Sequence, residues 1–193
     1  QKAISAYAAV YGDNTLIFSR GTEAPATYNG MPLSGMWRGI ETDSYTFDTI
    51  PWREYRSSLV SVSVSDDIAP VSMAHWFDSF TSLESIDLNG FNTANCEDMI
   101  SLFAHCSKLK SVDMSVLDTS NVRFMGSMFY GCSDLVAMDW SKNDTSKVEG
   151  MGNMFYECHN LETVNFGKRF NTENVQRMNN MFFDCPKLTV LDL

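Results

Sequence analysis

The chain has 193 residues, enough for one domain or for one domain with a small cap. Its net charge of −10 and its pI of about 4.6 exclude the basic surface that binding to nucleic acid or to anionic lipid heads requires. No apolar run approaches the roughly 20 residues of a membrane span, and five cysteines are too few for a disulfide scaffold.

Residues 1–56 contain no internal repeat and are predicted to form an N-terminal cap. The runs 7–11 and 16–18 flank the turn sequence GDNT, which predicts a β-hairpin. The stretch 21–50 is rich in Gly, Pro, Thr and Ser and predicts an irregular segment close to the surface. We expect these segments to cover the open end of the core that follows, because stacked repeats need a cap.

The remainder, 57–193, repeats with a period of about 26 residues. Five phenylalanines mark the period at intervals of 26, 26, 26 and 27, and apolar residues hold the same register around each one. The run LVSVSV at 59–64 fits the repeat as a degenerate first strand. The marker residues are Phe77, Phe103, Phe129, Phe155 and Phe182. This period is typical of solenoids, propellers and arrays.

The spacing within one unit predicts a short strand, a polar turn and a short helix. The run LKSVDM at 109–114 follows the leucine-rich-repeat strand pattern. Apolar residues in 122–132 recur at helical spacing, and Gly131 is placed to end a helix. In four units a threonine that follows Asp or Asn marks the turn, and we predict that it caps the turn. These threonines are Thr93, Thr119, Thr145 and Thr172. We therefore predict an α/β repeat solenoid of the leucine-rich-repeat type, with about five units behind the β-rich cap.

Stacked units of this kind are expected to curve. Neighbouring strands lie about 4.8 Å apart, whereas packed helices need roughly 8–10 Å. The units then splay on the helix side, and the strands line a concave face. Stacking also buries the apolar stripe that a single unit leaves exposed.

The unit can be written F/L-D/N-T-S-N-V-x-x-M-x-x-M-F-x-x-C-x-x-L-x-x-x-D, and its clearest copy is LDTSNVRFMGSMFYGCSDLVAMDW at 117–140. This pattern resembles the repeat of BspA-like bacterial leucine-rich-repeat surface proteins over about 71–193. Phe80 replaces Cys, Cys96 replaces Val and Asn165 replaces Asp in single copies. The resemblance implies an exported or surface-attached protein that serves adhesion or partner binding, without known chemistry.

An acidic column is predicted on the concave face, because each member lies between two inward-facing strand residues. Closely spaced carboxylates favour a bound cation, so the column is interpreted either as a strip for calcium or a basic ligand, or as a solvated row. Its members are Asp87, Asp113, Asp139, Asn165 and Asp192.

An aromatic residue follows the marker phenylalanine in three units, at Tyr130, Tyr156 and Phe183. On a helix this position lies about 100° from the core face. The three rings are interpreted either as an exposed strip of the kind that marks interfaces, or as rings that stack on one another. Together with the acidic column they form the candidate binding surface.

Four cysteines recur at one register position, and the total of five leaves at least one free or paired between chains. We expect a ladder of buried thiols that act as small hydrophobic side chains. A disulfide zipper, a metal row and a Cys–His nucleophile are the alternatives, but ligands strung along a line do not converge on one metal ion. The column is Cys106, Cys132, Cys158 and Cys185. We predict no metal and no cofactor.

The sequence carries none of the common catalytic motifs, so we predict a non-enzymatic protein. The favoured hypothesis is a secreted or cell-surface binding or adhesion module for a protein or glycan of the host or a neighbouring cell. The alternative is a structural spacer that displays another domain on the bacterial surface. An enzyme would require convergent polar groups in a pocket, for instance in the 21–50 loops.

Three further expectations concern the surroundings of the chain. We expect no nucleic-acid partner and no membrane span. We expect an extracellular or cell-surface location, with the leader removed. The last predicted strand is completed at Leu193, and no cap follows it. We therefore expect one of three situations: the native chain is longer, a partner covers this strand, or this end associates with a second copy of the chain.

Overall fold

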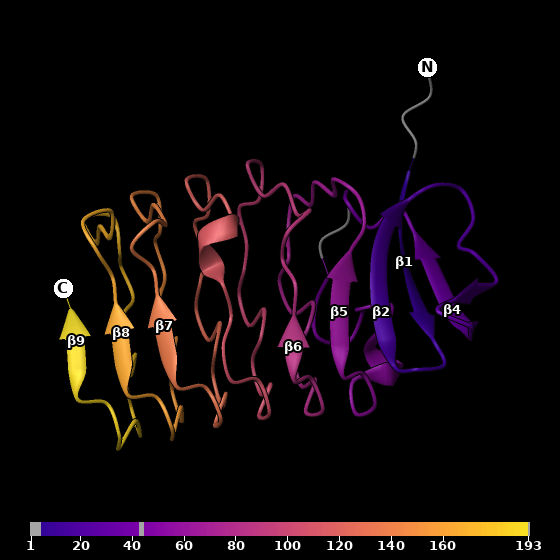
Figure 1. Cartoon of the computed structure of the whole chain (residues 1–193). Helices are drawn as coiled ribbons and strands as arrows, with labels where there is room; N and C mark the ends of the chain where they lie inside the picture. The colour runs from indigo at the N-terminus through magenta and orange to yellow at the C-terminus, as the bar shows by residue number, and fades with distance from the viewer. Residues whose placement is uncertain (1–4, 43–44, 193) are drawn as a thin grey trace.

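The computed structural model describes residues 5–42 and 45–192 and shows the repeat units side by side, from the N-terminal sheet at one end to the last unit at the other (Figure 1). The strands form one six-stranded and one three-stranded sheet. They are β1 (Ala6–Tyr11), β2 (Thr15–Arg20), β3 (Thr27–Tyr28), β4 (Met31–Arg38), β5 (Ser61–Val64), β6 (Ser85–Ile86), β7 (Ala137–Asp139), β8 (Thr163–Asn165) and β9 (Val190–Asp192). Two 3₁₀ helices are also present, η1 (Arg53–Tyr55) and η2 (Met114–Val116).

The six-stranded sheet joins the N-terminal segment to the repeats. Strands β1 and β2 form the predicted antiparallel hairpin, with Ala6 opposite Arg20 and Tyr11 opposite Thr15. Strand β5, within the run interpreted as a degenerate first strand, pairs in parallel with both β2 and β6. The hairpin therefore continues the ladder of the repeats. The division into domains at residues 56 and 57 stays a prediction.

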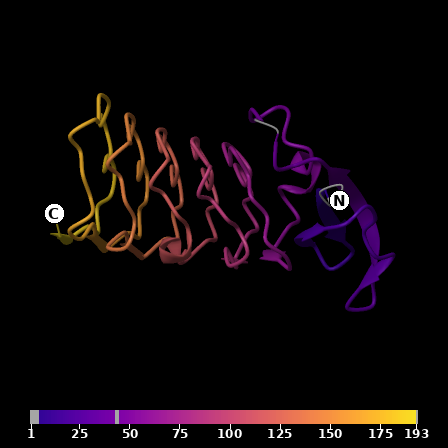
Figure 2. The same ribbon diagram turned by 90° about the horizontal axis from the view of Figure 1, so that it is seen from above.

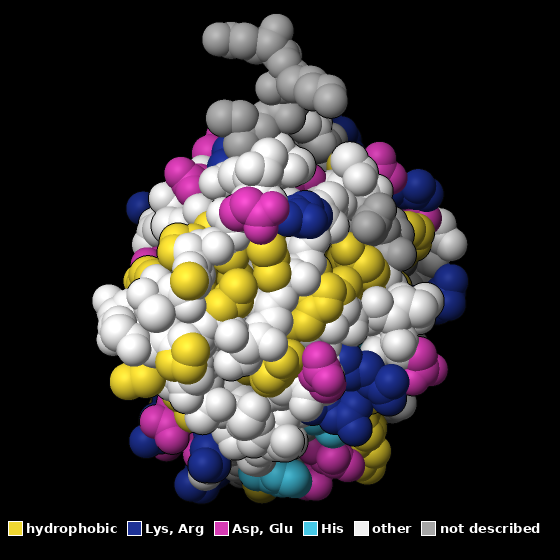
Figure 3. Space-filling model, turned by 90° about the vertical axis from the view of Figure 1, so that its right-hand side faces the viewer, with side chains coloured by type: hydrophobic (Ala, Val, Ile, Leu, Met, Phe, Trp, Pro, Cys, Tyr) yellow, Lys and Arg dark blue, Asp and Glu magenta, His cyan; other side chains and the backbone are white. Residues whose placement is uncertain are grey.

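The prediction of an irregular segment over 21–50 is partly wrong, because it contains β3 and β4. Strand β4 pairs with the outer edge of β1, and β3 pairs with β4. Gly35 permits this packing, since a Cβ atom there would lie 3.0 Å from the ring of Trp37. Figure 3 views this end of the molecule, where apolar side chains are partly exposed. Tyr28 and Met31 are 37% and 41% exposed.

The predicted helix in each unit is wrong, and with it the α/β fold class: the described residues contain no α-helix. The segment is a succession of tight turns. The amide of Leu102 donates to the carbonyl of Met99 three residues back, whereas the amides of Ser101 and Phe103 donate to the next unit. Ser101 has a φ of 53° and His105 one of 59°, a left-handed conformation that interrupts a helix.

This left-handed pair recurs in every unit, four residues apart. Viewed from above, the turns form narrow loops that repeat along the molecule (Figure 2). Six of the ten positions carry Gly, Asn, Asp or His, which adopt this conformation more readily than other residues, and four carry Ser or Glu. No one residue type recurs in every unit, and the apolar spacing predicted a helix. The pairs are His75 and Ser79, Ser101 and His105, Ser127 and Gly131, Asn153 and Glu157, and Asn180 and Asp184.

The marker phenylalanines stack in single file through the core. From Phe77 to Phe182, the centroids of each two successive rings are 5.4–5.6 Å apart, and the planes of the two rings differ by 2–17°. This separation is close to the spacing of strands in a sheet. Without helices that need wider spacing, the reason for predicting a concave strand face no longer holds.

The strand predicted at 109–114 is not formed, although Val112 and Met114 are buried as expected. The side chain of Asp113 accepts a hydrogen bond from the amide of Ser115 at 3.0 Å. Met114–Val116 then form η2 in place of a strand. The parallel ladder is therefore interrupted between β6 and β7.

Candidate functional site

The acidic column lies on the surface but is committed to local turns. Asp87 and Asp113 are exposed, and each accepts a hydrogen bond at 3.0 Å from the amide two residues later. In Asp139 the corresponding bond from Ser141 lowers the pKa of the carboxyl group. The side-chain amide of Asn165 donates to Asp139 at 3.2 Å. The side chain of Asp192 lies outside the described residues.

The predicted aromatic rings combine both interpretations, since they stack on one another at the surface. Tyr130 and Tyr156 have centroids 4.8 Å apart, as do Tyr156 and Phe183. His105 extends the stack, 4.9 Å from Tyr130. The two tyrosines are half-buried, and Phe183 at the end of the row is 56% exposed.

The cysteine column is a ladder of free thiols with a specific bonding role. The thiol of Cys132 donates to the carbonyl of Phe103 in the preceding unit at 3.0 Å, and that of Cys158 donates to the carbonyl of Phe129 at 3.1 Å. Burial raises the pKa of both thiols. Cys96, outside the column, is also buried, which raises its pKa to about 11. These thiols are neutral at physiological pH and are used inside the core.

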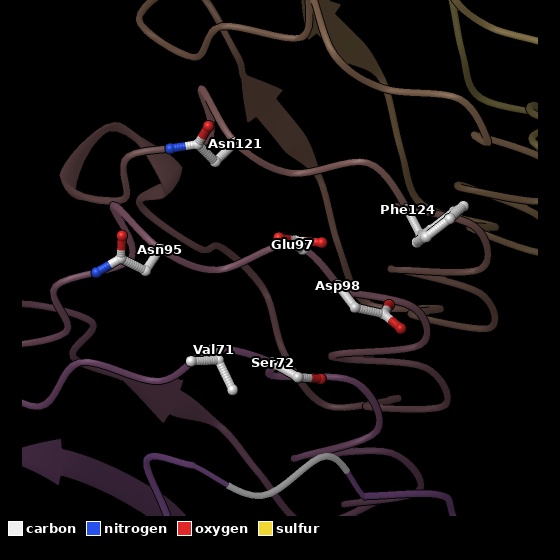
Figure 4. Close-up of a pocket in the computed structure, with 7 residues that line it drawn as sticks. All are labelled: Val71, Ser72, Asn95, Glu97, Asp98, Asn121 and Phe124. Atoms are coloured by element: carbon white, nitrogen blue, oxygen red, sulfur yellow. The ribbon is translucent and has the colours of Figure 1, made fainter.

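A row of hollows, which the sequence patterns did not indicate, lies along a second ladder of the stack. Single parallel bridges connect one residue of each unit to the next, in the order Ser72, Asp98, Phe124, Gly150 and Arg177. The first hollow has a volume of 660 Å³. Figure 4 shows Asp98 and Phe124 at one end of it, Asn95 and Asn121 at the other, and Glu97 between them.

A second hollow, here called the glycine hollow, shares Asp98 and Phe124 with the first and has a volume of 530 Å³. Its floor consists of Gly126, Gly150 and Gly152. A Cβ atom on Gly150 would have no neighbour within 4 Å, so the space above this residue is open. A Cβ atom on Gly152 would instead lie 2.9 Å from the side chain of Asn179, so the open space is at Gly150. Glycine at this register position was the available sequence signal.

Arg123 and Asp98 are charged side chains at the glycine hollow whose contacts the structure gives. The guanidinium group of Arg123 lies 2.7 Å from the carboxylate of Glu149 and 4.0 Å from that of Glu97. It also lies over the ring of Phe124, 5.1 Å from the centroid. Burial raises the pKa of Asp98, although the amide of Ile100 donates to its carboxylate at 2.9 Å.

Several amides at the edge of the hollow are not committed to hydrogen bonds. Among the described residues, the side chains of Asn153, Gln176 and Asn179 have no hydrogen-bonding partner. An amide group offers both donors and an acceptor. The hollow therefore presents solvent-facing amides, two of them on the exposed Gln176 and Asn179, beside the half-buried ring of Phe124. Over the same described ranges, no group of three or more His, Cys, Asp or Glu is arranged to hold a metal ion.

Residues 71–190, more than half of the chain, match the family described as Mycoplasma protein of unknown function, DUF285. The chain belongs to this family. The matched range of the DUF285 protein contains all five marker phenylalanines and both hollows. No curated protein matches it.

Among solved structures, the DUF285 protein is similar to a leucine rich cell surface protein from Faecalibacterium prausnitzii A2-165, with a TM-score of 0.51 and 19% sequence identity. The alignment covers 99% of this chain and 55% of the other, so the chain spans about half the length of that protein. At this identity the similarity extends to the fold. In the described part of the chain, no helix is long and apolar enough to cross a membrane.

Proposed function

We propose that this chain is a non-enzymatic binding module of a bacterial cell surface, with the row of hollows as its contact surface. The single observation that carries the proposal is the concentration of unpaired amides beside the partly exposed ring of Phe124. The column thiols, the strongest nucleophile candidates in the sequence, are instead bonded within the core.

The location of the module is inferred from its relatives. The similar solved structure is described as a cell surface protein, and the repeat resembles that of BspA-like surface proteins. Both support an extracellular or surface-attached role for this chain, with a protein or glycan of the host or a neighbouring cell as the partner. Self-association through the last unit stays a further proposal.

A second candidate function, that of a structural spacer, is supported by the continuous file of stacked rings. Such a file couples each unit to its neighbours and keeps the molecule extended. A spacer, however, leaves the unpaired amides of the glycine hollow without a role. Binding is therefore the better-supported function.

The two candidates differ in a cell-binding measurement. Fluorescently labelled protein is titrated onto intact mammalian epithelial cells and onto bacterial cells, with an unrelated acidic protein of the same size as the control. A binding module gives a saturable signal that unlabelled protein displaces. A signal equal to that of the control on every cell type contradicts the binding function and favours the spacer.

A further inference from the structure

The glycine hollow contains a gap above Gly150, here called the slot, between the units that carry Phe124 and Arg177. In the bridge ladder, Gly150 lies between Phe124 and Arg177. The backbones of Phe124 and Arg177 are two steps apart in this ladder, which corresponds to about 10 Å. Because Gly150 has no side chain and nothing lies within 4 Å of its Cβ position, the space between these two units is open at Gly150, while the guanidinium group of Arg123 lies over the ring of Phe124, 5.1 Å from its centroid. A flat ring of a ligand fits such a slot.

The backbone around the slot is not available to a ligand. The amides of Met125 and Ser127 donate to the carbonyls of Gly150 and Gly152, and the amide of Met151 donates to the carbonyl of Arg177. An extended peptide that binds by strand addition needs free backbone groups of this kind. Recognition in the glycine hollow therefore depends on side chains, which disfavours a peptide as the ligand.

The charges of the hollow balance one another. Glu149 is paired with Arg123 at 2.7 Å, which leaves Asp98 at one end and Arg177 at the other. Neither a polyanion nor a polycation is complementary to this arrangement. The unpaired amides of Asn153, Gln176 and Asn179 instead suit a ligand whose groups both donate and accept hydrogen bonds.

We infer that the glycine hollow binds a neutral oligosaccharide, one sugar ring of which lies against Phe124 above Gly150. The apolar face of the sugar covers the aromatic ring, and its hydroxyl groups bond to the surrounding amides and to Asp98. This inference rests on the proposed binding function and names the ligand class of the same surface.

The test is calorimetric titration of the whole chain with short linear neutral oligosaccharides of gluco, manno and galacto configuration. Sialylated and uronic-acid oligosaccharides and a lysine-rich peptide serve as charged probes. Gly150→Leu fills the slot, and its matched control is Ala137→Leu, which adds the same side chain at an exposed position of β7. Phe124→Ala removes the ring. Melting temperatures establish that each variant is folded.

At least one neutral oligosaccharide is expected to bind the unaltered chain. Gly150→Leu is expected to abolish this binding, Phe124→Ala to weaken it by about tenfold, and Ala137→Leu to leave it unchanged. Binding that is insensitive to folded Gly150→Leu overturns the assignment of the site. Preference for a charged probe overturns the ligand class. If no oligosaccharide binds while cells are still labelled saturably, the inference fails and the proposed function stands; if both measurements are negative, both fail.

Discussion

At the scale of single residues, side-chain donors at fixed register positions join each unit to the next. The hydroxyl groups of Thr93, Thr119 and Thr145 donate to backbone carbonyls of the following unit at 2.8–2.9 Å. The column thiols donate in the opposite direction, to the preceding unit. Among the described residues, the carbonyls that accept from the threonines have no other donor, which explains why threonine recurs with the period of the repeat. The carbonyls of Phe103 and Phe129, which accept from the thiols, also accept from the amides of Cys106 and Cys132.

The threonine contacts give a direct stability prediction. Thr119→Val keeps the shape of the buried side chain but leaves the carbonyl of Asp144 without its donor, so we expect a loss of about 1–3 kcal/mol in the free energy of unfolding. Thr172→Val is the matched control, because Thr172 is exposed in the last unit, and we expect a change within about 0.5 kcal/mol. Urea denaturation measures both. Equal losses in the two variants would show that the contact between units is unimportant.

At the scale of the element, the tight turns are the feature that the sequence did not reveal. Sequence spacing identified the buried positions correctly: Met125, Met128, Phe129 and Cys132 are all fully buried. Those positions are shared by a helix and by a run of turns, since both return a side chain to the core every three or four residues. The left-handed residues distinguish the two structures, but Ser101 and Ser127 are not typical left-handed residues.

Substitution at Ser127 distinguishes a turn from a helix by the sign of the effect. Ser127 has a φ of 56°, a conformation that costs a non-glycine residue about 1–2 kcal/mol. We expect Ser127→Gly to increase the free energy of unfolding by up to about 1 kcal/mol, and Ser127→Ala to leave it nearly unchanged. In a helix the order is reversed, because glycine costs about 1 kcal/mol relative to alanine. Thermal and urea unfolding of the two variants provide the comparison.

The candidate site could be predicted only in part, because sequence patterns show where side chains recur and not where they are missing. The acidic and aromatic columns were found because a side chain recurs at one register position in successive units. The glycine hollow is open where a side chain is missing, at Gly150, and a search for recurring side chains does not detect such a position. The role of the cysteines as donors was also hidden, because it depends on the carbonyl of a residue in another unit.

At the scale of the whole molecule, the repeat units form a stack that begins on the N-terminal sheet. The hairpin of β1 and β2 continues into β5 and β6 through parallel pairing, so the first repeat is built on the edge of a sheet. From there the file of rings extends through the core to Phe182. This arrangement gives each hollow its walls, because the residues that line it come from successive units.

The measurement that tests this stack most directly is a nuclear Overhauser spectrum of protein labelled only at its phenylalanine rings. With centroids 5.4–5.6 Å apart, the rings of Phe103, Phe129 and Phe155 are expected to give cross-peaks between each successive pair, assigned with single Phe→Leu variants. Absence of these cross-peaks in folded protein would contradict both the stacking of the units and the surface built on it.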